Sequence, residues 1–159
     1  MKTSDKGLAL IRTFEGCVLQ AYKCPAGVWT IGIGHTAGVM PGDRITEQEA
    51  LRLLDQDVHP IEQRLNETFP WLSQNQFDAL VSFIFNLGWM AFRNSTLCRR
   101  IKAKAGDRLV CEQLFRWHFA NKMPLLGLMK RRVAEANLWM GRQAYQVVVK
   151  NNQAKIVSV

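Results

Sequence analysis

The sequence predicts an α+β fold in which a small β-hairpin lobe is followed by a larger helical lobe. Residues 17–33 combine β-branched and aromatic residues with glycines around a turn at Pro25-Ala26-Gly27, which is typical of a hairpin. From Thr46 onward, apolar residues recur every three or four positions, which is typical of amphipathic helices. Because the strand signals precede most of the helical ones, we expect the strands to form a lobe of their own.

The segment before the hairpin predicts a short helix. Ser4 or Asp5 can cap its start, and Gly16 is placed to end it, so that Glu15 lies at the helix exit. After the hairpin, the residues from 36 to 43 contain two glycines and a proline and predict a loop or a third short strand.

Two capping boxes predict the main helices of the second lobe. Thr46 opens a long amphipathic helix that we expect to bend near Pro60, and Ser73 opens a helix that is apolar nearly all round. The second of these is typical of the buried centre of a lobe, and Gly88 is expected to end it. Further helices are expected from Ser95 to near Gly106, from Asp107, and from Leu126 to Trp139.

We expect a single domain over residues 1–159, since 159 residues suffice to bury one core. The β-rich lobe is placed at about 15–45, the helical lobe at 46–145 and a tail at 146–159. The tail lacks a helical period, and we expect it to be frayed or a stray strand.

The chain is basic, with 21 Lys and Arg against 13 Asp and Glu and a net charge of +8. Such a charge favours a polyanionic partner such as nucleic acid or an anionic envelope polymer, and simple solubility is the alternative explanation. No apolar run approaches the roughly 20 residues of a membrane span, and the first six residues do not form a signal peptide. We therefore expect a soluble protein made in the cytoplasm.

Three side chains around the hairpin suggest a chemistry. Glu15, Cys24 and Thr30 supply a carboxyl, a thiol and a hydroxyl, and Thr30 shares its strand face with Gly32 and Gly34. Glycoside cleavage needs one carboxyl to protonate the leaving oxygen and a second group to activate water or attack the sugar. A thiolate can be that second group, and a hydroxyl can hold the water. The alternatives are a solvated Glu15, a small buried Cys24 and a structural Thr30.

The same stretch strongly resembles the phage-type lysozymes, the endolysins of glycoside hydrolase family 24. These enzymes carry Glu, eight residues, Asp, five residues and Thr within the pattern EG…AY…G…TIGIGH. The present chain has that pattern from Glu15 to His35, with Cys24 at the position of the Asp. The likeness covers roughly residues 5 to 142 and continues in LSQNQFDAL and FNLG of the central helix.

The resemblance implies a lysozyme-like fold and a muramidase that cleaves the β-1,4 bond between N-acetylmuramic acid and N-acetylglucosamine. It implies Glu15, Cys24 and Thr30 as catalytic residues and Asn86 and Arg131 as substrate-binding residues. His35 is expected to be structural, paired with Asp57. Lys130 to Arg132 form a basic run that is usually a solvated face, one member of which would meet peptide carboxylates.

The cysteine at position 24 has a counterpart in a subset of these lysozymes, which also carry a cysteine two residues after the Glu, here Cys17. In that subset an N-terminal anchor exports the enzyme and cysteine pairing holds it inactive. We hypothesise that Cys17 and Cys24 form a disulfide in an oxidising periplasm, although an extended strand between them would span more than about 20 Å. The other two cysteines, Cys98 and Cys111, show no zinc spacing.

The expected partner is peptidoglycan, with no nucleic acid, no membrane span, no cofactor and no metal. The chain is expected to be a monomer held in the host cytoplasm until a separate holin releases it to the periplasm and cell wall. The alternative is a non-catalytic basic module of the same fold that binds the cell envelope or nucleic acid. No nucleic-acid-binding motif supports that alternative.

Overall fold

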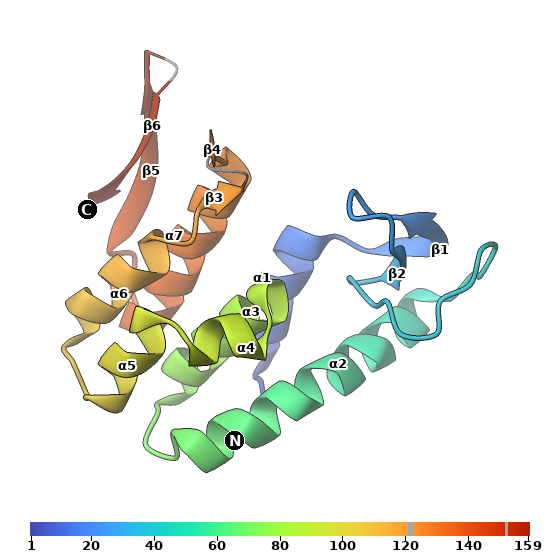
Figure 1. Cartoon of the computed structure of the whole chain (residues 1–159), viewed down its shortest axis with the longest axis horizontal. Coiled ribbons are helices and arrows are strands. Elements are labelled where there is room, and N and C mark those ends of the chain that lie inside the picture. Colours follow the sequence, from blue (N-terminus) through green and yellow to red (C-terminus); the bar gives the residue numbers. More distant parts are fainter. Residues whose placement is uncertain (121–122, 152) are drawn as a thin grey trace.

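The computed structural model describes residues 1–120, 123–151 and 153–159. Its N-terminal part is a helix, α1 (Asp5–Glu15), followed by an antiparallel hairpin of β1 (Val18–Lys23) and β2 (Trp29–Gly32). Gly16 ends α1 at a φ of 73°, a left-handed conformation that favours glycine, as predicted. The hairpin and the loop behind it form a small lobe at one end of the molecule (Figure 1).

A long helix, α2 (Glu47–Thr68), links this lobe to the rest of the chain (Figure 1). The capping box at Thr46 is confirmed: its hydroxyl accepts a hydrogen bond from the amide of Glu49, and the Glu49 carboxylate accepts one from the amide of Thr46. The helix continues through Pro60 to Thr68.

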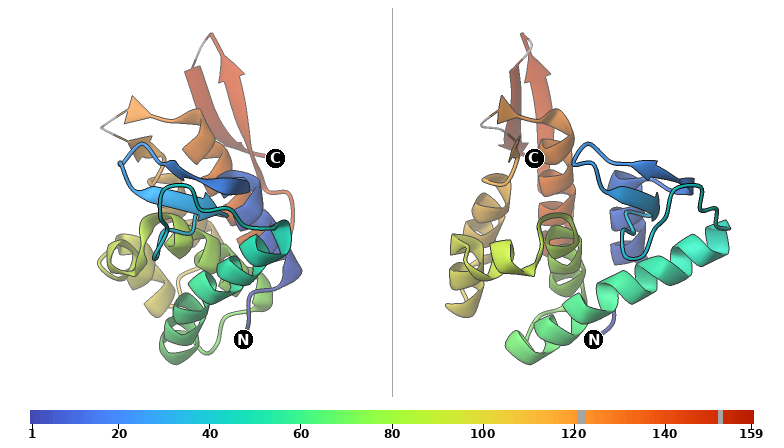
Figure 2. Two further views of the ribbon diagram at one scale, coloured as in Figure 1. Left: turned by 90° about the vertical axis from the view of Figure 1, so that its right-hand side faces the viewer. Right: turned by 45° about the vertical axis from the view of Figure 1, so that its right-hand side comes forward.

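The centre of the second lobe is α3 (Gln74–Leu87), whose residues from Phe77 to Ile84 are all buried. This confirms the expected central helix, its capping box at Ser73 and its end at Gly88. It packs against α1 and α2 and against the last helix, which the two views of Figure 2 place beside it. The remaining helices are α4 (Trp89–Arg93), α5 (Thr96–Lys102), α6 (Asp107–Phe115) and α7 (Leu126–Met140).

Two helix ends differ from the prediction. The helix that begins after Ser95 stops at Lys102, before Gly106, and Lys104 then adopts a φ of 49°. Asp107 begins α6 but does not cap it with its side chain. Its carboxylate instead accepts hydrogen bonds from the indole of Trp139 at 2.8 Å and from Gln76 at 3.2 Å. These long-range contacts leave no local signal in the sequence.

The tail is neither frayed nor a single strand. β5 (Tyr145–Lys150) and β6 (Gln153–Ser158) pair as an antiparallel hairpin, with Asn152 outside the described residues. Val147 lies opposite Ile156, and both pack against the core. A shorter pair, β3 (Phe119–Ala120) and β4 (Met123–Pro124), stands beside it (Figure 1).

The predicted alternation along β2 is wrong at Gly32. A methyl group added there would lie 3.2–3.3 Å from Ile45 and Ala50, so Gly32 faces helix α2 and not an open groove. Gly32 adopts a φ of 63°, far from the extended conformation of a strand, and this breaks the two-residue period on which the prediction relied. No helix in the described ranges combines the length and apolar character that a membrane crossing requires.

Candidate active site

Glu15 ends α1 with its side chain partly exposed, 24% of it accessible to solvent. One carboxylate oxygen, Oε1, accepts a hydrogen bond from Nη1 of Arg131 at 2.6 Å. The other, Oε2, lies against Gly34, where an added methyl group would come within 3.5 Å of it. Gly34 has a φ of 79°, so both its conformation and this close approach favour glycine. Arg131 therefore fixes one oxygen of the carboxyl, whereas the other makes no hydrogen bond within the described residues.

Arg131 is buried, with 3% of its side chain exposed. Besides Glu15, its guanidinium donates to the carbonyl of Ser82 at 3.1 Å and to Glu135 at 3.3 Å. The expectation that this basic run is a solvated face is wrong for Arg131 and Arg132, since both turn inward from α7. Arg131 holds Glu15 in place rather than presenting its charge to an open surface.

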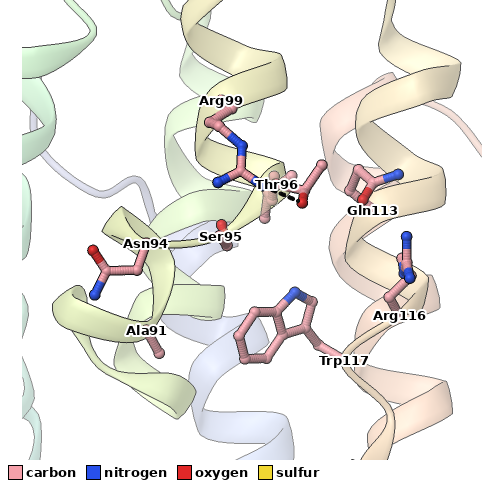
Figure 3. A pocket seen from close by; sticks show the side chains of 9 residues that line it. Ala91, Asn94, Ser95, Thr96, Arg99, Gln113, Arg116 and Trp117 are labelled. Atoms are coloured by element: carbon pink, nitrogen blue, oxygen red, sulfur yellow. Dashed lines mark hydrogen bonds between the residues drawn. The ribbon is translucent and has the colours of Figure 1, made fainter.

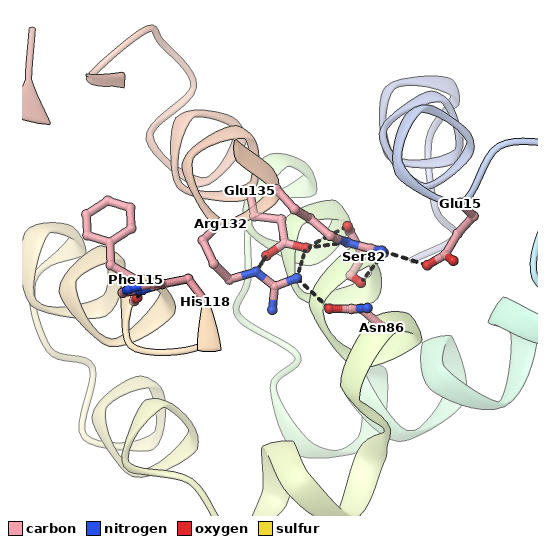
Figure 4. A network of polar contacts seen from close by, with 8 residues as sticks. Glu15, Ser82, Asn86, Phe115, His118, Arg132 and Glu135 are labelled. Carbon is pink, nitrogen blue, oxygen red and sulfur yellow. Dashed lines mark hydrogen bonds and ion pairs between the residues drawn. The ribbon is translucent and has the colours of Figure 1, made fainter. Parts of the chain in front are cut away.

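Asn86 belongs to the same network, which Figure 4 shows. Its side-chain oxygen accepts a hydrogen bond from Nη2 of Arg132 at 2.9 Å, and Arg132 in turn contacts both oxygens of Glu135. Glu135 thus lies between Arg131 and Arg132. Because the Asn86 oxygen is occupied, its NH2 group remains to donate to a ligand, which suits a sugar hydroxyl or N-acetyl oxygen.

Cys24 and Thr30 come together at the hairpin turn. The turn is closed by a hydrogen bond of 2.9 Å from the backbone amide of Cys24 to the carbonyl of Val28. The Thr30 hydroxyl donates to the same carbonyl at 3.1 Å. Hydrogen bonds from the backbone at Val28 and Ala26 lower the pKa of the Cys24 thiol, and the Thr30 side chain adds to this effect. A thiol with a lowered pKa has a larger thiolate fraction, which is the reactive form.

The two cysteines of the helical lobe are different. Cys98 and Cys111 are buried, and burial raises the pKa of the Cys98 thiol and that of Cys111 to about 12. Their thiols are therefore inert packing groups. Among the described residues, no three His, Cys, Asp or Glu side chains gather where a metal could bind.

The lowered pKa of Cys24 predicts its pH profile of alkylation. Since the thiolate forms at lower pH, reaction of Cys24 with iodoacetamide should reach half its maximal rate below the pH of about 8.5 typical of a free cysteine. The measurement is mass spectrometry of the Cys24 peptide over a pH series, in a Cys17→Ser variant so that one partly exposed thiol remains. A midpoint at or above the ordinary value would contradict the role assigned to the backbone hydrogen bonds.

Cys17 and Cys24 are free thiols at opposite ends of β1. Seven residues of extended chain span about 23 Å, whereas a disulfide needs its Cα atoms within about 7 Å. The hypothesised bridge is thus incompatible with this conformation, and its formation requires that β1 be lost.

The cleft between the lobes contains a hollow of about 310 Å³. It is lined by Gly34 and the loop after it, by Asp57 and Arg64 of α2, and by Phe85 and Trp89 of α3 and α4. His35 pairs with Asp57 at 2.8 Å, as predicted, and its other ring nitrogen contacts the carbonyl of Ala37 at 2.9 Å. This pair ties the end of the hairpin to α2 at the edge of the cleft.

A larger hollow of about 580 Å³ lies between α4–α5 and the end of α6, as Figure 3 shows. Its polar lining comes from Asn94, Thr96, Arg99, Gln113 and Arg116, and the indole of Trp117 forms an apolar wall. Two guanidinium groups and two amides suit a ligand that carries carboxylates or amides.

The sequence predicted the catalytic candidates but missed their support. Ser82 and Glu135 were not singled out, although Glu135 stands three and four residues after the two arginines of α7, a spacing at which helical side chains meet. That spacing was the available signal. No hydrogen bond or ion pair within the described residues joins Glu15 directly to Cys24.

Comparison with known proteins places this site in a family. The family model of phage lysozyme matches residues 12–135. An endolysin of Acyrthosiphon pisum secondary endosymbiont phage 1 is 41% identical over 145 residues, covering 87% of this chain and 98% of that protein. A SAR-endolysin of Escherichia phage P1 is 35% identical, with 87% and 81% covered.

Solved structures of phage endolysins and of a muramidase domain resemble this chain. The muramidase domain of SpmX from Asticaccaulis excentricus superposes with a TM-score of 0.81 at 38% identity, covering 87% of this chain and 97% of that one. The active form of the P1 phage endolysin Lyz gives 0.80 at 32% identity, with 89% and 86% covered, whereas its secreted inactive form gives 0.59 at 30%, with 88% and 96% covered. The chain belongs to the phage lysozyme family. It is a glycoside hydrolase of the lysozyme type with the α+β fold expected from its sequence.

Proposed function

We propose that the chain is an endolysin that hydrolyses the β-1,4 bond between N-acetylmuramic acid and N-acetylglucosamine in bacterial peptidoglycan. The observation that carries this proposal is the placement of Glu15, with one oxygen fixed by Arg131 and the other left without a hydrogen bond beside Gly34, which lines the cleft. The names of its relatives, endolysin and muramidase domain, support the same activity.

In this proposal Glu15 is the general acid. It donates its proton from Oε2 to the glycosidic oxygen as the bond from that oxygen to the sugar carbon breaks, and the sugar develops oxocarbenium character. Cys24 acts as the general base: its thiolate takes a proton from the water that attacks the sugar carbon. The Thr30 hydroxyl, next to the thiol, orients that water. Asn86 donates from its amide to the substrate.

This assignment fixes the expected stereochemistry. A base that activates water gives inversion at the sugar carbon, whereas attack by the thiolate itself forms a glycosyl-thioether intermediate and gives retention. If the reducing ends are released with inverted configuration at the sugar carbon, the result supports Cys24 as a general base and not as a nucleophile.

The decisive experiment measures release of reducing ends from purified Gram-negative peptidoglycan. Cys24→Ala should lower kcat by about 10²- to 10⁴-fold, because it removes the base. Cys24→Asp should stay within about tenfold of the parent, since a carboxylate can accept the same proton.

Cys17→Ser is the matched control, because Cys17 is also a partly exposed thiol of the hairpin region but has no proposed role. Its kcat for the release of reducing ends should equal that of the parent. Iodoacetamide should inactivate the parent and Cys17→Ser but not Cys24→Asp. Full activity of Cys24→Ala would show that Cys24 is not the general base. An inactive parent protein would contradict the proposed hydrolysis of peptidoglycan.

We further propose that the chain acts as a monomer in the periplasm on the cell wall, after a separate holin releases it from the host cytoplasm. The names of several relatives, SAR-endolysins, indicate a second route of export for the family. Expression of the 159-residue chain in a Gram-negative host should lyse the cells only when a holin is co-expressed. Lysis without a holin contradicts this dependence.

A further inference from the structure

The positive charge of the chain is concentrated near its C-terminus. Residues 113–159 contain eight Lys and Arg and a single acidic residue, so they account for seven of the eight net positive charges. That one acid is Glu135, which is fully buried between two arginines. Arg131 and Arg132 are buried with it. The described surface of this segment therefore exposes basic side chains and no acidic ones, the basic ones being Arg116, Lys130, Arg142, Lys150 and Lys155, whereas the rest of the chain is nearly neutral.

Exposed apolar side chains occupy the same segment. Phe119 is 53% exposed, Met123 68%, Leu126 43% and Val149 55%. They come from β3, β4, the start of α7 and β5, and both hairpins extend from the same end of the molecule (Figures 1 and 2). Scattered apolar residues are ordinary on a surface, but a group of them beside basic residues indicates a binding surface.

The two hairpins lie next to each other. A hollow of about 470 Å³ is lined on one side by Pro124, Leu126 and Met129 and on the other by Val149 and Lys155. We call the exposed surface at this end the distal patch. The distal patch comprises the exposed tip formed by the two hairpins. Phe119, Met123, Leu126 and Val149 lie on the side of the hollow, and the strand register places Lys150 and Lys155 on the face of the β5–β6 hairpin opposite to Val149.

The β5–β6 hairpin is anchored at its base only. Val147 and Ile156 pack against the core, while Lys150 and Gln153 pair at the far end, where both are exposed. A two-stranded hairpin is marginally stable in water without packing partners. The hairpin also lies beyond residue 135, where the match to the family model ends. Its distal half thus lies outside both the hydrophobic core and the residues that match the family model.

We propose that the distal patch docks on the surface of a bilayer that contains anionic phospholipids. Lysines on one face of the hairpin attract the negative headgroups, and the apolar side chains at the same end of the molecule enter the interface, the combination that interfacial binding requires. The polar sugars of peptidoglycan offer nothing to Met123 or Val149, and a second copy of the patch would bring like charges together. The inference goes beyond the proposed hydrolysis and does not depend on it.

The first test measures co-sedimentation of the full chain with vesicles of phosphatidylcholine, with and without phosphatidylglycerol, at low and high salt. The double variant Lys150→Glu/Lys155→Glu should weaken binding to the anionic vesicles by at least about tenfold. The control is Lys2→Glu/Lys6→Glu, which makes the same change in net charge at two exposed lysines near the N-terminus and should bind like the parent.

The second test concerns the apolar contribution. Met123→Ser should weaken binding to the same vesicles, whereas Met40→Ser should not, although Met40 is 63% exposed in the loop after the hairpin of the small lobe. Circular dichroism and turnover of purified peptidoglycan should be unchanged in all four variants, since none of these residues lies in the proposed site.

Three results would overturn the proposal. They are absence of binding to anionic vesicles, equal binding to vesicles of phosphatidylcholine alone, and equal loss in the patch and control variants. The last of these would show that net charge, and not the distal patch, causes the attraction. Self-association of the chain that disappears in the patch variants, without vesicle binding, would assign the patch to a second copy instead.

Discussion

Replacing Glu15 by Gln is expected to lower kcat on purified peptidoglycan by about 10²- to 10⁴-fold, since the variant cannot donate the proton that the leaving oxygen needs. Gln has nearly the same shape, and its carbonyl oxygen can still accept the hydrogen bond that Arg131 donates at 2.6 Å. Folding and binding of peptidoglycan should therefore be retained. The assays are reducing-end release and co-sedimentation with insoluble peptidoglycan.

Glu47→Gln is the matched control. Glu47, at the start of α2, also forms an ion pair with an arginine, Arg12 of α1, but both side chains are exposed. Its kcat should equal that of the parent. If Glu15→Gln kept substantial turnover, or lost turnover only because it no longer bound peptidoglycan, Glu15 would not be the general acid.

Features of the fold that depend on neighbouring residues could be predicted from the sequence. The capping boxes at Thr46 and Ser73 and the glycine at Gly16 each act within one helical turn, so a short stretch contains the whole signal. The tail could not be predicted in the same way. Its strands contain runs such as Val147 to Val149 that do not alternate, and only their pairing and the core beneath them explain the hairpin.

The candidate site likewise combines local features, which could be predicted from the sequence, with long-range contacts, which could not. Glu15, Cys24 and Thr30 lie within one short segment, where their residue types suggested a site and the resemblance of the segment to phage-type lysozymes predicted it. Arg131 contacts Glu15 across 116 positions in the sequence, and Arg132 reaches Asn86 across 46. Periodicity shows which face of α7 is apolar, but it does not show that two arginines turn inward to a buried carboxylate.

That buried carboxylate leads to the largest expected effect on stability. Glu135 is fully buried and contacts Arg131, Arg132 and the hydroxyl of Ser82, which donates to it at 2.8 Å. Glu135→Gln removes its charge and leaves two buried guanidinium groups to repel each other. Removing one partner of a buried ion pair costs about 3–5 kcal/mol. Since about 1 kcal/mol shifts Tm by about 2–4 °C in a chain of this size, we expect Tm to fall by about 10 °C.

The control is Glu112→Gln, which breaks the ion pair with Arg108 on α6, where the side chains are 49% and 82% exposed. Its Tm should change little, because exposed pairs contribute about 0–1 kcal/mol. A thermal melt that finds the two variants equally stable would contradict the buried network.

The network also links stability to catalysis, since Arg131 bridges Glu135 and Glu15. Glu135→Gln should therefore also lower kcat at temperatures where the variant is folded, because Arg131 is freed to shift and the carboxyl it positions loses its fixed orientation.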